Sequence, residues 1–70
     1  MIPATQNELI DKLVDLRELS PEVRFGQLLA NLGFLVEDRT GRSLWDVDDA
    51  QMLEVMKEHR ADLLRRQADA

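Results

Sequence analysis

Apolar residues recur at three- and four-residue intervals along most of this chain, and this spacing limits the folds open to it. The first run has five apolar positions, Leu9, Ile10, Leu13, Val14 and Leu16. Charged residues lie between them, which is the pattern of an amphipathic α-helix with 3.6 residues per turn. Upstream, Thr5 and Glu8 have the spacing of a capping box. We therefore expect a first helix at residues 6–19, with Thr5 as its N-cap.

A second helix is predicted at residues 21–35. Ser20 is a favourable N-cap, and Pro21 would occupy the first helical position, where its missing N–H costs nothing. The apolar arc of this segment is nearly twice as wide as that of the first helix, so we expect the second helix to be central. Gly26 and Gly33 lie on this arc, and the lack of side chains predicts a close crossing with another helix.

A third helix is predicted at residues 49–66, where Asp48 repeats the capping-box spacing. The segment 37–43 before it is polar with a central glycine, which is typical of a loop. Trp45 follows, and we expect it to cover one end of the core. Residues 67–70 have nothing to bury and are expected to fray.

The chain has 70 residues and no cysteine. So short a chain cannot build a second core, and we expect one all-α domain over residues 1–70. In it the first two helices form an antiparallel hairpin and the third packs across them. The absence of cysteine suits a reducing compartment, and there is no secretory signal or membrane-spanning run. These features predict a cytoplasmic protein without a membrane segment.

Three polar residues, Arg24, Gln27 and Asn31, share one strip of the otherwise apolar second helix. Two interpretations are open for them. The strip could bind a protein partner, or it could form an internal network in which Arg24 pairs with an acidic residue and the amides satisfy loop carbonyls.

Two blocks of sequence carry a resemblance. Residues 24–32 read Arg-Phe-Gly-Gln-Leu-Leu-Ala-Asn-Leu, and residues 44–49 read Leu-Trp-Asp-Val-Asp-Asp. Together they resemble a pattern of short uncharacterised bacterial proteins, in which an Arg-Phe/Leu-Gly-Gln-Leu-x-x-Asn block precedes an acidic helix start. The resemblance implies a bacterial or phage origin and draws attention to Arg24, Gln27 and Asn31. It implies no mechanism.

Arg60 is an unusual residue, because it projects into the apolar arc of the third helix. A guanidinium there must be paired or reach water, so Arg60 either forms a salt bridge to the first helix or belongs to a partner surface. Residues 46–54 hold four carboxylates, but the sixth position of a calcium loop beginning at Asp46 is Gln51 rather than glycine. His59 lies at the rim of the apolar face without a nucleophile partner. We expect no metal, no cofactor and no catalytic residue.

The net charge of the chain favours protein binding over nucleic-acid binding. The net charge is −5, which argues against a protein that grips phosphate backbones. The most basic end, residues 60–70, has three arginines against two aspartates. We therefore expect a non-enzymatic protein–protein interaction module, such as a regulator or immunity-type component, with a protein partner or as a homodimer. The alternative is a nucleic-acid-linked regulator that uses the basic C-terminal end.

Overall fold

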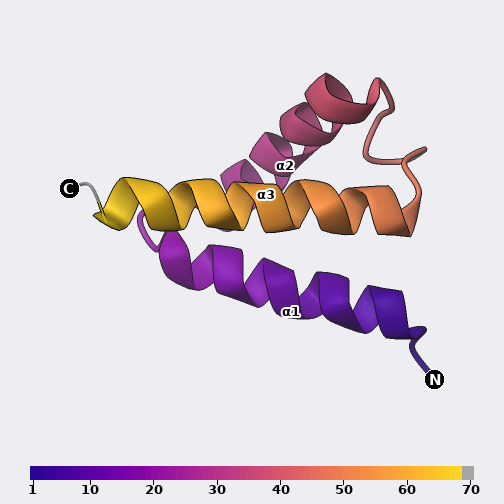
Figure 1. The fold of residues 1–70 in the computed structure, drawn as a ribbon, viewed down its shortest axis with the longest axis horizontal. Coiled ribbons are helices and arrows are strands. Elements are labelled where there is room, and N and C mark those ends of the chain that lie inside the picture. The colour runs from indigo at the N-terminus through magenta and orange to yellow at the C-terminus, as the bar shows by residue number, and fades with distance from the viewer. Residues whose placement is uncertain (69–70) are drawn as a thin grey trace.

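The computed structural model describes residues 1–68, which form three α-helices (Figure 1). These are α1 (Ala4–Leu19), α2 (Phe25–Thr40) and α3 (Asp49–Ala68). No strand occurs among the described residues. The predicted all-α class with three helices is confirmed.

Helices α1 and α3 lie side by side and run in the same direction (Figure 1). Near their N-terminal ends, Nε2 of Gln6 donates a hydrogen bond to Oδ2 of Asp49 at 3.1 Å. Near their C-terminal ends, Nε2 of Gln67 donates to the carbonyl of Leu19 at 2.9 Å. The chain reverses after α1, and α2 packs on α3 while touching α1 only slightly. The central helix is therefore α3, and the expectation that the second helix is central is wrong.

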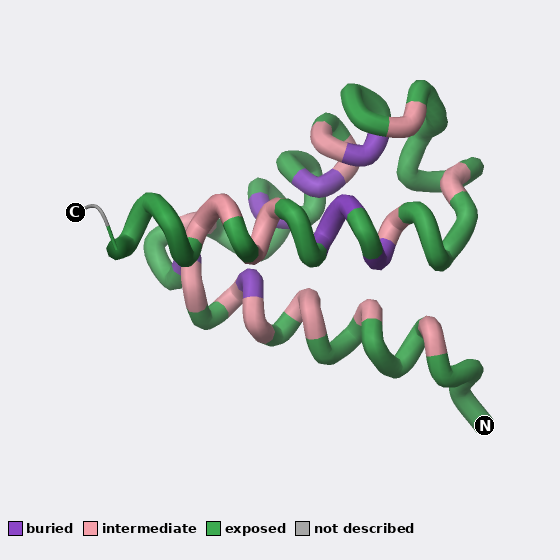
Figure 2. The backbone as a smooth tube through the Cα atoms, viewed as in Figure 1, coloured by how far each residue is buried: buried purple, intermediate pink, exposed green. Residues whose placement is uncertain are grey.

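The core lies where the three helices meet. Four fully buried side chains form its central cluster, Leu16, Leu28, Leu32 and Met56, and burial of each contributes roughly 1.5–3 kcal/mol. Five partly buried residues pack against them: Leu9, Leu13, Val23, Met52 and Leu63. Figure 2 shows that buried positions concentrate on α2 and α3, whereas most of α1 is exposed or intermediate. One flank of α1 is thus left without a covering element.

The first two helices begin elsewhere than predicted. Pro3, not Thr5, is the N-cap of α1, and its carbonyl accepts the N–H of Asn7 at 3.0 Å. Ser20 is the C-cap of α1, and its N–H bonds to the carbonyl of Leu16. The carbonyl of Ser20 accepts from Val23 and from the guanidinium of Arg17. These bonds make residues 20–23 a turn, so α2 starts four residues later than predicted.

Helix α2 also continues beyond its predicted end at Leu35. The segment expected as a loop is helical as far as Thr40, whose hydroxyl donates to the carbonyl of Val36 at 2.6 Å. Gly41 ends the helix in the left-handed conformation, with φ 72°, and its N–H bonds to the carbonyl of Glu37. This extension contacts the rest of the protein, because Val36 is fully buried and Arg39 forms ion pairs with α3.

The predicted start of α3 is confirmed. Asp48 directly precedes the helix, and its carbonyl accepts the N–H of Met52 at 2.9 Å. The helix runs to Ala68, and Gln67 is hydrogen-bonded to α1. The expected fraying is therefore wrong for residues 67–68, and residues 69–70 lie outside the described part of the chain.

Two packing predictions are wrong. The side chain of Trp45 is 94% exposed and covers no part of the core. A Cβ atom built on Gly26 or Gly33 would meet nothing within 4 Å, so no helix crosses closely there. Helix α2 meets the rest of the protein through the buried face of Leu28 and Leu32 instead, and the glycine face remains open.

Candidate functional site

An apolar groove opens between α1 and α2 and is the strongest candidate site. Its volume is about 130 Å³ and its lining is entirely apolar. The lining residues, here called the α1–α2 groove, are Leu9, Ile10, Leu13, Leu29, Leu32, Met52 and Met56. The groove exists because α1 and α2 both pack on α3 but make few contacts with each other. Met52 and Met56 of α3 contribute flexible, polarizable side chains to its lining.

Large apolar side chains remain exposed on both sides of this groove. On α1, Ile10 and Val14 are about half exposed, at 49% and 50%. On α2, Phe25 is 52% exposed and Leu29 38% exposed. Ile10 and Val14 are four residues apart and so share one face of α1. The apolar arc of α1 is wider than the surface that α3 covers, and the remainder faces outward.

The surface area of the whole chain is larger than is usual for its mass. A monomer of 8.1 kDa normally exposes about 4500 Å², whereas this chain exposes 5033 Å². Its Cα radius of gyration is 12.1 Å, against about 11 Å for a typical domain of this length. The three helices thus leave roughly 500 Å² more surface in contact with solvent than a typical domain of this mass.

The predicted polar strip lies outside this groove. Arg24, Gln27 and Asn31 are all exposed, and none of them lines the groove. Arg24 is the N-cap of α2, where its backbone carbonyl accepts the N–H of Leu28 at 2.9 Å. Within residues 1–68, the side chains of these three residues make no hydrogen bond and no ion pair with the rest of the protein. The structure therefore brings the strip to the surface without the internal partners of the alternative interpretation.

Arg60 makes the predicted salt bridge to the first helix. Its Nε lies 3.3 Å from Oδ2 of Asp15, and this Nε atom is buried. The contact is an ion pair without hydrogen-bond geometry. An open pocket of about 310 Å³ with a mixed polar and apolar lining adjoins it, lined by Asp15, Glu18, Leu19 and Arg60. The structure thus assigns Arg60 a role in joining α1 to α3.

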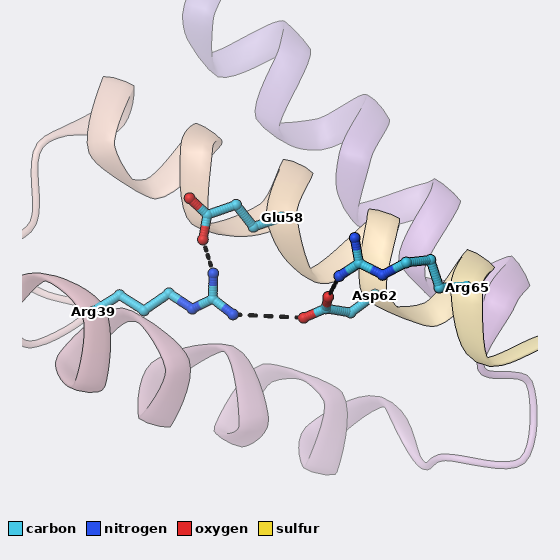
Figure 3. A network of polar contacts seen from close by, with 4 residues as sticks. All are labelled: Arg39, Glu58, Asp62 and Arg65. Carbon is cyan, nitrogen blue, oxygen red and sulfur yellow. Dashed lines mark hydrogen bonds and ion pairs between the residues drawn. The ribbon is translucent and has the colours of Figure 1, made fainter.

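A second ionic cluster joins α2 to α3 (Figure 3). Arg39 of α2 reaches two carboxylates of α3, pairing with Glu58 and lying 3.6 Å from Asp62. Asp62 also pairs with Arg65, one turn further along α3. The sequence reasoning missed this cluster because it placed residue 39 in a loop. The sequence did contain a signal for this cluster, because the polar residues after Leu35 continue the helical spacing of α2.

His59 lies near this cluster and is partly buried. Burial lowers the pKa of His59 below its usual 6.5, and the positive charges of Arg66 and Arg39 lower it further. The charged form of His59 is therefore disfavoured in the folded protein.

Across residues 1–68, no three His, Asp or Glu side chains come together in a group that could hold a metal ion. No helix in this part of the chain has the length and apolarity needed to cross a membrane. No family model, curated protein or solved structure matches the chain.

Proposed function

We propose that the protein is a small protein–protein interaction module whose docking surface is the α1–α2 groove. The observation that carries this proposal is the exclusively apolar lining of the groove between half-exposed Ile10 and Leu29. Contiguous exposed apolar surface of this kind marks interaction sites in small globular proteins.

The shape of the groove favours a helical occupant. It lies between two helices, and an amphipathic helix can place apolar residues at positions i, i+4 and i+7 into such a groove. Met52 is only partly buried, and its flexible, polarizable side chain can adapt to different apolar side chains. The expected partner element is therefore a helix with one apolar face.

The charge of the chain favours a partner with basic residues beside that apolar face. A net charge of −5 attracts basic surfaces and accelerates their association. This combination suits a regulator or an immunity-type component that masks a basic protein. A cysteine-free chain also suits the cytoplasm.

The nucleic-acid alternative has less support. Arg39, Arg60 and Arg65 are each paired with a carboxylate of this chain. Their charges are thereby partly neutralised, and nothing in the described residues favours phosphate binding over protein binding.

The proposal is tested with a displayed library of amphipathic helical peptides at low protein concentration. We expect selected peptides to carry an apolar stripe at helical spacing and to shift the backbone NMR signals of groove residues. Leu29→Glu should weaken their binding at least about tenfold, which is about 1.4 kcal/mol.

The matched control is Phe34→Glu, which adds the same charge to α2 at an exposed position outside the groove. Binding to this variant should be unchanged, and circular dichroism should show both variants folded. The proposal is wrong if no peptide is selected, or if binding is lost in Phe34→Glu and retained in Leu29→Glu.

A further inference from the structure

We propose that the occupant of the α1–α2 groove is an amphipathic helix of another protein, with a lysine or arginine one helical turn beyond its apolar residues that lies over Asp48 and Asp49. This inference rests on the proposed function, because it specifies the chemistry and the placement of the partner in the same groove. The two aspartates gain this role from their position at one end of an apolar groove.

Asp48 and Asp49 lie at the end of the groove where α3 begins. Met52, which lines the groove, follows them by four and three residues, so the three positions share one side of α3. On α1, Gln6 precedes the lining residue Leu9 by one turn, and its Nε2 donates a hydrogen bond to Oδ2 of Asp49 at 3.1 Å. This hydrogen bond places the Asp49 carboxylate between α1 and α3, beyond the apolar lining.

The carboxylates at this end of the groove have no internal counter-charge. Residues 44–49 contain three aspartates and no basic residue. Asp46, Asp48 and Asp49 are exposed, and within residues 1–68 none of them forms an ion pair. Carboxylates further along α3 are paired with arginines instead. This end of the groove therefore keeps a negative charge that a partner can neutralise.

The opposite end of the groove does not carry this charge. Arg17 lies one turn after the lining residue Leu13, so it marks that end on α1. Residues 17–24 contain two arginines and two glutamates, and their charges cancel. A basic residue of the partner is thus attracted to one end of the groove, and this difference sets which end of the partner's apolar stripe lies beside α3's first turn.

Lysine and arginine have the chemistry that such a site recognises. Their apolar stems can lie along Met52 while the charged head reaches the carboxylates. The apolar contacts supply most of the affinity, whereas exposed charges mainly set the orientation and the association rate. The net charge of −5 acts in the same sense at longer range, and it disfavours a second copy of this chain as the occupant.

Two blocked synthetic peptides test the proposal, each of about fifteen residues, the length at which an isolated helix begins to be stable. Both are alanine- and glutamine-based helices with one stripe of leucines at helical spacing. The first has lysines one turn before and one turn after the stripe, so it can bind in either direction. The second has glutamine in place of every lysine. We expect calorimetry at low salt to show that the lysine peptide binds about fivefold more tightly.

An Asp48→Asn/Asp49→Asn variant separates the local charge from the net charge, because asparagine keeps both the N-cap and the acceptor for Gln6. The dissociation constant of the lysine peptide should rise about fivefold at low salt and less than about twofold at about 0.5 M salt. That of the glutamine peptide should change less than about twofold. The matched control, Asp38→Asn/Glu54→Gln, removes two charges at exposed positions outside the groove and should barely affect either peptide.

Equal binding of the two peptides to the natural chain overturns the proposal, and so does a control variant that weakens the lysine peptide as much as the Asp48→Asn/Asp49→Asn variant does. In both cases, peptide binding that is lost in Leu29→Glu would leave the proposed function intact. If neither peptide binds, the proposed function fails as well. A mass of twice 8.1 kDa without peptide, abolished by Leu29→Glu, would place a second copy in the groove and also overturn the proposal.

Discussion

Arg60 of α3 holds its Nε atom 3.3 Å from Oδ2 of Asp15 on α1, and this ion pair links the two parallel helices. Both side chains are more than one-third exposed. Solvent therefore screens the attraction, and pairs of this kind contribute about 0–1 kcal/mol.

The two partners of this pair should differ in their mutational cost. Asp15→Ala leaves the buried Nε of Arg60 without a counter-charge and should lower the free energy of unfolding by about 1 kcal/mol. Arg60→Met removes the charge and keeps an apolar stem, so it should cost less. Urea denaturation of both variants measures the difference. An Arg60→Met variant that is less stable than Asp15→Ala would contradict this explanation.

The glycines of α2 should be replaceable with a gain in stability. A Cβ at Gly26 or Gly33 meets no atom within 4 Å. Alanine there should raise the free energy of unfolding by about 0.5–1 kcal/mol through helix propensity. Gly41→Ala is the contrasting control, because φ 72° is strained for alanine and the change should cost about 1 kcal/mol. Melting temperatures of the three variants measure whether each substitution stabilises or destabilises the fold.

His59 should make stability depend on pH. Its pKa is lowered in the folded state by burial and by Arg66 and Arg39. As the pH falls below 6.5, the unfolded chain takes up this proton before the folded chain does. The free energy of unfolding should therefore decrease as the pH falls through this range. His59→Gln should show a smaller decrease between pH 7.5 and 5.5, as measured by urea midpoints, and an equal decrease would exclude His59 as the cause.

Trp45 should behave as a fully hydrated residue. Its fluorescence should lie at the long wavelengths of solvated indole and be quenched readily by acrylamide, because the side chain is 94% exposed. Trp45→Ala should change the free energy of unfolding by less than about 0.5 kcal/mol. A blue-shifted, protected tryptophan would restore the idea that it covers the core.

Two of the three predicted N-caps, Asp48 and Thr5, should respond differently to alanine. Asp48 occupies the residue before α3, so Asp48→Ala should cost about 1 kcal/mol. Thr5 lies inside α1, after the true N-cap Pro3, and Thr5→Ala should be nearly neutral because alanine favours a helix. Equal costs in thermal unfolding would show that Thr5 contributes a cap after all.

Much of the secondary structure could be predicted from local patterns. The period of apolar residues identified three helices, and Asp48 marked the start of α3 correctly. The salt bridge of Arg60 to the first helix was also predictable, because a guanidinium on an apolar face needs a nearby carboxylate. The end of α2 could not be predicted from local patterns. Arg39 near that end forms ion pairs with residues of α3 that lie about twenty positions away in sequence.

The sequence by itself determined that the chain forms helices, and only the tertiary structure decided how they pack. Periodicity and caps act over a few residues, so they specify where a helix can form but not which neighbour covers its apolar arc. That choice depends on contacts such as those of Leu16 with α2 and α3. It made α3 the central helix, left Gly26 and Trp45 exposed, and opened the groove beside Ile10, because one helix cannot cover the apolar arcs of two others completely.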